Sequence, residues 1–123
     1  MMVALLARGP GNFFTMTDKI IVLSTCATEE EAEKLARALL EERLAACVSV
    51  ISTMRSFYHW KGAIESAPEC LLVIKSSREL FEPLCAALQK LHSFEVPELL
   101  ALPVVAGGVN YLNWLESNVR GSP

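Results

Sequence analysis

The stretch KIIVLSTC, from Lys19 to Cys26, decides the fold. It is a β-branched apolar run of strand length with apolar side chains at successive positions, which is typical of a strand buried on both faces. Thr28 follows as a predicted helix N-cap, and Glu31 stands three residues later in the position of a capping box. An apolar stripe at helical spacing then predicts a helix that runs to about Ala45.

The same pattern continues to the end of the chain. Apolar runs predict strands at residues 47–52, 70–75 and 99–105, with a hairpin turn at Lys61-Gly62 and a second helix from about Ser77. Pro103 marks the last strand as an edge strand, and Asn110 is the expected cap of a short terminal helix.

The order of these elements is βαββαβ plus a short C-terminal helix. It predicts an α/β (α+β) fold of the ferredoxin-like split β-α-β type, a two-layer sandwich. A right-handed crossover makes the first two strands parallel, with the third strand between them. We assign residues 18–119 to this domain, 1–17 to a weakly structured N-terminal extension and 120–123 to a C-terminal tail.

Composition excludes several classes of protein. Apolar residues make up 52% and charged residues 20% of the 123 positions, which excludes disorder. The net charge of −3 argues against a nucleic-acid partner, and no apolar run approaches the ~18 residues that a membrane span needs. The four cysteines form no C-x-x-C pair and suit reduced thiols, so we expect a cytoplasmic protein with no membrane partner.

The predicted topology brings chemically distinct side chains to one end of the sheet. Cys26 ends the first strand, His92 follows the second helix and Glu98 precedes the last strand; the aromatic hairpin around His59 lies at the same end. A thiol, an imidazole and a carboxylate suit copper or zinc. Other interpretations stay open: His92 as a helix cap, Glu98 in an ion pair, Cys26 as a half-buried thiol and His59 in packing.

An enzyme is not expected. The sequence contains no G-x-S-x-G, P-loop or G-x-G-x-x-G motif. Cys26 with His92 could form a nucleophile–base pair, but nothing local supplies an oxyanion hole.

The chain closely resembles the CutA divalent-ion tolerance family over about residues 19–119. The matching segments are Val22–Cys26, Arg43–Val48, Ser56–Gly62, Leu91–Glu98, Ala101–Val104 and Tyr111–Leu115.

This resemblance implies a ferredoxin-like fold in a tightly packed homotrimer, architecturally similar to PII signalling proteins. It also implies a role in tolerance to divalent metals, with Cu(II) or another divalent ion as ligand, and a metal site formed by Cys26, His92 and Glu98. The alternative function is a PII-like sensor that binds a small molecule between subunits, using groups such as Arg55, Lys75 or Arg78.

Overall fold

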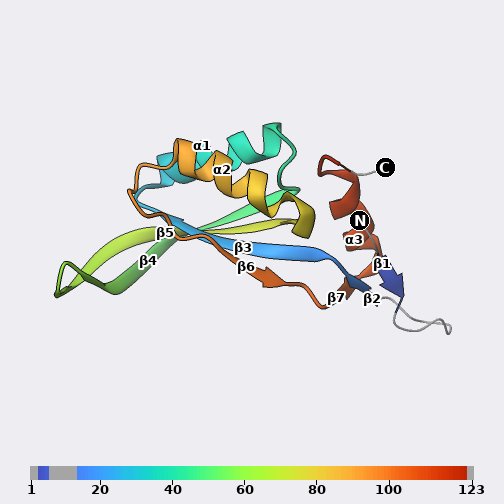
Figure 1. Cartoon of the computed structure of the whole chain (residues 1–123), viewed down its shortest axis with the longest axis horizontal. Coiled ribbons are helices and arrows are strands. Elements are labelled where there is room, and N and C mark those ends of the chain that lie inside the picture. Colours follow the sequence, from blue (N-terminus) through green and yellow to red (C-terminus); the bar gives the residue numbers. More distant parts are fainter. Residues whose placement is uncertain (1–2, 6–13, 122–123) are drawn as a thin grey trace.

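A four-stranded antiparallel sheet with two helices on one face forms the body of the molecule (Figure 1). The computed structural model describes residues 3–5 and 14–121. The sheet order is β4-β5-β3-β6, and these strands are Cys47–Trp60 (β4), Ala63–Ser77 (β5), Lys19–Cys26 (β3) and Leu100–Pro103 (β6). Helices α1 (Glu29–Glu41) and α2 (Phe81–Leu91) cover its upper face in this view.

This topology confirms the predicted mixed α+β fold. Strand β5 lies between β3 and β4 and runs antiparallel to both, so β3 and β4 are parallel to each other. Pro103 lies on the edge strand β6, where its missing N–H costs no ladder bond. Lys61 and Gly62 form the hairpin turn with positive φ angles of 52° and 83°, which match the right-handed twist of paired strands.

Several boundaries differ from the prediction. Helix α1 ends at Glu41 rather than near Ala45, because Arg43 adopts a positive φ of 55° and turns the chain back toward the sheet. Strands β4 and β5 extend through the aromatic segment, with a bulge between Ile51 and Met54. A 3-10 turn, η1 (Arg78–Leu80), precedes α2, so that helix begins at Phe81 rather than near Ser77.

The N-terminal segment takes part in a second sheet. The sequence predicts a weakly structured extension at residues 1–17, but the structure places strands at Val3–Leu5 (β1) and Phe14–Thr17 (β2). Strand β2 pairs with β1 and with Ala106–Gly108 (β7), so main-chain hydrogen bonds on both sides hold it in the sheet. Residues 1–2 and 6–13, also within that predicted extension, lie outside the described residues.

Alternate side chains of β3 and β5 form the core beneath α1 and α2. Those pointing toward the helices are almost wholly buried, whereas the central residues of the other face (Ile21, Leu23, Leu71, Val73 and Lys75) are half-buried. The helix-facing residues of the two strands are Ile20, Val22, Ser24, Cys26, Cys70, Leu72, Ile74 and Ser76. Among the described residues, no helix has the length and apolar character needed to cross a bilayer.

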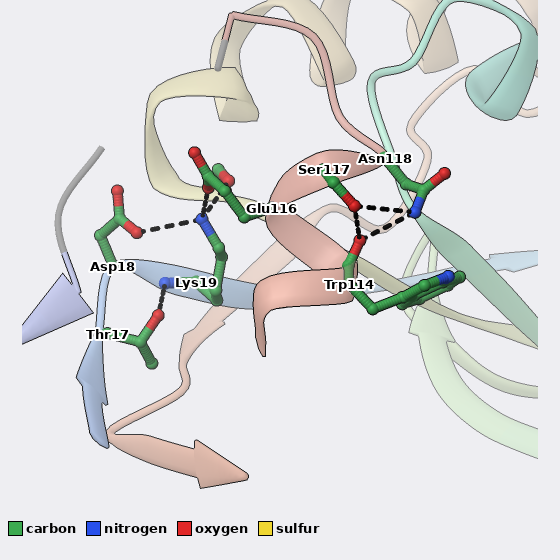
Figure 2. A network of polar contacts seen from close by, with 8 residues as sticks. Thr17, Asp18, Lys19, Trp114, Glu116, Ser117 and Asn118 are labelled. Carbon is green, nitrogen blue, oxygen red and sulfur yellow. Dashed lines mark hydrogen bonds and ion pairs between the residues drawn. The ribbon is translucent and has the colours of Figure 1, made fainter. Parts of the chain in front are cut away.

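A buried lysine attaches the C-terminal helix α3 (Val109–Ser117) to the start of β3 (Figure 2). The Lys19 side chain is 0% exposed, and its Nζ donates to Ser77 Oγ at 3.0 Å and to Asp18 Oδ1 at 3.3 Å. It also forms an ion pair with Glu116 of α3. Because a buried ammonium needs partners for its donors, these contacts determine where α3 docks.

Replacing this lysine should weaken the fold. Lys19→Met keeps the length of the side chain but removes the ammonium that contacts Asp18 and Glu116. We expect a loss of about 2 kcal/mol in the free energy of unfolding, below the ~3–5 kcal/mol of a fully buried pair because both carboxylates keep some exposure. Urea denaturation at fixed protein concentration measures it, with the exposed Lys34→Met as the matched control. Equal stability of the two variants would contradict a stabilising role for the contacts of Lys19.

Candidate functional site

His92 caps the C-terminal end of α2 and is buried against the end of β3. Its Nε2 lies 2.6 Å from the carbonyl oxygen of Thr25, and its Nδ1 accepts a hydrogen bond from the Phe94 N–H at 2.9 Å. A carbonyl can only accept and an amide N–H can only donate, so the ring is neutral with its proton on Nε2. Both ring nitrogens are therefore occupied by the main chain, and neither presents a free lone pair to a metal ion.

Glu31, in the first turn of α1, holds the loop that follows His92. Its carboxylate accepts hydrogen bonds from the Ser93 N–H at 2.8 Å and from the Ser93 hydroxyl at 3.0 Å, and it reaches the Ala27 N–H at 3.5 Å. The nearer carboxylate oxygen is 3.8 Å from His92 Nδ1. Burial alone raises the pKa of Glu31, but the hydrogen bonds from Ser93 and Ala27 outweigh it and hold the pKa below its usual value of 4.5.

The role of Glu31 is only half visible in the sequence. The capping-box pattern places it correctly near the start of α1, and Thr28 Oγ1 does accept from the Glu31 N–H at 3.1 Å. However, the carboxylate bonds mainly to Ser93, a partner 62 residues away. No spacing in the sequence signals that contact, since it exists only because α1 and α2 lie side by side on one sheet (Figure 1).

Cys26 is wholly buried at the end of β3. Its Sγ donates to the Thr28 carbonyl oxygen at 3.4 Å. Burial, followed by the neighbouring Cys70 and Glu31, raises its pKa to about 12. The thiol is therefore protonated at neutral pH, whereas a cysteine metal ligand is a thiolate.

The other candidate metal ligands lie outside the contacts that join His92, Glu31 and Ser93. Glu98 is half-buried in the segment between α2 and β6, and His59 is exposed on β4 opposite Ile64, close to the hairpin tip. Within the described part of the chain, no group of three or more His, Cys, Asp or Glu side chains is placed to hold a metal ion. A single chain therefore does not assemble Cys26, His92 and Glu98 into a coordination site.

The basic groups considered for a small-molecule site are also separate. Arg55 Nη1 donates to Ser66 Oγ at 3.3 Å within the hairpin, and Lys75 Nζ donates to Ser49 Oγ at 2.8 Å on the uncovered sheet face. Arg78 lines a shallow pocket at the start of α2, beside β6. These three side chains do not converge on one cavity within a chain.

The contacts of Glu31 predict a pH-dependent stability. The folded pKa lies below the ordinary value of 4.5, so the carboxylate stabilises the fold above that pH, and this contribution is lost as the pH falls through the folded pKa. We expect Glu31→Gln to be about 1 kcal/mol less stable at pH 7 and to approach the wild type in acid. Urea denaturation between pH 7 and pH 3 measures this.

Glu33→Gln is the matched control. Glu33 lies on the same helix and pairs with Arg37 at 2.9 Å, but both side chains are about two-thirds exposed. An exposed i,i+4 pair contributes little, so its removal should leave the pH profile nearly unchanged. A profile for Glu31→Gln that matches that of Glu33→Gln would refute the assigned role of Ser93 and Glu31.

Comparison with known proteins places this geometry in a family. The chain is 42% identical over 98 residues to the divalent-cation tolerance protein CutA of Thermus thermophilus, covering 80% of this chain and 95% of that protein. It is 40% identical over 101 residues to the chloroplastic protein CutA of Arabidopsis thaliana, covering 82% of this chain and 56% of that longer protein.

Solved structures agree with the sequence relatives. The crystal structure of CutA1 from Oryza sativa matches with a TM-score of 0.84 at 34% identity, over 87% of this chain and 98% of that one. The Thermus thermophilus structure of divalent cation tolerance protein Cut A1 matches with a TM-score of 0.80 at 40% identity, over 82% and 98% of the two chains. The family model described as CutA1 divalent ion tolerance protein matches residues 20–118. The chain therefore belongs to the CutA1 divalent ion tolerance protein family.

Proposed function

We propose that this protein acts in divalent-cation tolerance as a cytoplasmic homotrimer that binds copper(II) or another divalent ion, without catalytic activity. Family membership supports the role in cation tolerance. The assembly is supported by the second face of the four-stranded sheet, which is apolar and which no helix of the described residues covers. The four free thiols suit a reducing compartment, although relatives carry the names chloroplastic and periplasmic.

The uncovered face is continuous across all four strands. Residues directly opposite one another in an antiparallel ladder share a face, so the strand registers identify its members. Leu102 aligns with Ile21, and Leu100 with Leu23 and then Val73. The apolar side chains of this face are Ile21, Leu23, Ile51, Leu71, Val73, Leu100 and Leu102. Ile51, Leu100 and Leu102 are 51%, 55% and 47% exposed, which is typical of an interaction surface.

The shape of the hairpin supports a ring rather than a simple dimer. Strands β4 and β5 project beyond the helices, and the projecting end carries the exposed side chains of Phe57, Trp60 and Ile64 (Figure 1). If this end packs on the neighbouring copy, the two contacting surfaces differ. A contact between different surfaces is heterologous and closes only as a ring, of which the trimer is the smallest.

Metal binding is best supported at Glu98. His92 and Cys26 are engaged as described above, whereas the Glu98 carboxylate is half-buried and appears in no polar contact that the described residues make. A lone carboxylate is a weak site, so we propose that a neighbouring copy completes the coordination. His92 then positions the loop that carries Glu98 and is not itself a ligand.

The assembly predicts a concentration-independent trimer mass. Light scattering coupled to size exclusion should give three chains at micromolar concentration. Ile51→Lys and Leu102→Lys place a charge on the uncovered sheet face and should shift the mass toward one chain. Leu40→Lys is the matched control, because Leu40 is similarly exposed at 39% but lies on α1. A wild-type monomer at this concentration overturns the trimer.

Metal binding is tested by calorimetric titration of Cu(II) into the trimer. Glu98→Gln should weaken binding at least about tenfold, as expected when a ligand oxygen loses its charge. Glu95→Gln, an exposed carboxylate in the same segment, is the matched control and should bind as the wild type does.

His92→Ala separates the two ligand hypotheses. We expect it to bind Cu(II) within about twofold of the wild type where it remains folded, because the ring nitrogens are occupied by the main chain. A loss equal to that of Glu98→Gln restores the Cys26, His92 and Glu98 set. Absence of Cu(II) binding by the wild type refutes the metal proposal, and the trimer mass is judged separately.

A further inference from the structure

Two of the four cysteines face each other across neighbouring strands. Cys26 of β3 and Cys70 of β5 are directly opposite in the antiparallel ladder. Both point toward the helices and belong to the core, with exposures of 0% and 3%. Cys47 and Cys85 have no such partner: Cys47 is opposite Lys75, and Cys85 lies on α2.

The positions of this pair suit a disulfide bond. Directly opposed residues in an antiparallel ladder have Cα atoms about 4.5–5.5 Å apart, and disulfides span Cα distances of about 4.4–6.8 Å. Cys70 is also among the neighbours that raise the pKa of Cys26, as expected of two side chains that lie close together. No backbone movement between strands is needed to bring them together.

We propose that Cys26 and Cys70 form a dithiol site that hydrogen peroxide oxidises to a cross-strand disulfide. The Cys70 sulfur, after losing its proton, attacks one peroxide oxygen; the O–O bond breaks, giving a sulfenic acid and one water. The Cys26 sulfur then attacks the Cys70 sulfur, the S–O bond breaks, and the hydroxyl leaves with the Cys26 proton as a second water. Two thiols are oxidised and one peroxide is reduced to two waters.

The surroundings of Cys70 provide a route for a small oxidant. Its Sγ lies 3.9 Å from the carbonyl oxygen of Ser52. Ser52 lies in the bulge of β4 between Ile51 and Met54, where the ladder with β5 is interrupted. Cys26 is the last residue of β3. Strand ends and bulges open locally at lower free energy than the centre of a sheet, so peroxide reaches the pair without global unfolding.

The bond also bears on the candidate site. Cys26 follows Thr25, whose carbonyl oxygen holds His92. A disulfide would therefore link the end of β3 to β5. The loop after α2 contacts this end of β3 through His92. It also closes a loop that contains α1 and β4, which constrains the unfolded chain and should raise the thermal midpoint of the oxidised protein.

The test isolates the pair from the other thiols. The Cys47→Ser/Cys85→Ser variant, folded and at native oligomeric state, is treated with hydrogen peroxide and its intact mass is measured under denaturing, non-reducing conditions. We expect a mass lower by two hydrogen atoms per chain, restored by dithiothreitol, together with a higher thermal midpoint. A folded variant that stays unchanged, or that only gains oxygen atoms, overturns the proposal.

Two further measurements guard against an effect of the substitutions. Peptide mapping of the oxidised wild-type protein should recover the Cys26 and Cys70 peptides joined to each other, and any other dominant pairing refutes the site. Adding Cys70→Ser to the double variant is the matched control, and it should abolish the loss of two hydrogen atoms. If a disulfide-linked dimer forms instead, the bond can join chains and the cross-strand assignment is wrong.

Discussion

Alternate side chains of β3 and β5 are buried beneath α1 and α2, and the other features of this molecule depend on that one-sided packing. Burial of apolar area is the main favourable term in folding, at roughly 25 cal/mol per Å². Because side chains alternate across a strand, a slip of one residue would move Val22 and Ile74 out of the core. The packing thus determines the register of the sheet, the ends at which the helices finish, and which face of the sheet the two helices leave uncovered.

Polar contacts then secure the two ends of β3. At its start, Lys19 joins the strand to β5 and α3; at its end, the Thr25 carbonyl accepts from His92, and Glu31 holds Ser93. The side chains of Lys19 and His92 are shielded from water and need partners within the protein. The central strand is therefore attached at both ends to the helices, and the loop that leads to Glu98 leaves from a fixed point.

The residues that hold this end of the sheet together differ from the residue that we propose as a metal ligand. The imidazole of His92 and the thiol of Cys26 have the right chemistry for a soft metal ion, yet main-chain hydrogen bonds occupy the first and burial keeps the second protonated. Glu98 has neither constraint, which is why we propose it as a ligand whose coordination a neighbouring copy completes. The opposition of Cys26 and Cys70 at the same end of the sheet is the basis of the proposed redox site, which needs no metal.

Local pattern was sufficient for the order of the elements in the four-stranded sheet and its two helices, the turn at Lys61-Gly62, the cap at Thr28 and the edge position of Pro103, because period, turn chemistry and capping act over a few residues. It also placed His92 correctly beside the end of β3. Only the tertiary structure decided that His92 bonds the main chain, that Glu31 reaches Ser93, that Cys26 meets Cys70, and that β2 joins β7. These contacts join residues far apart in the chain, so they follow from how layers pack and strands align, which no local spacing encodes.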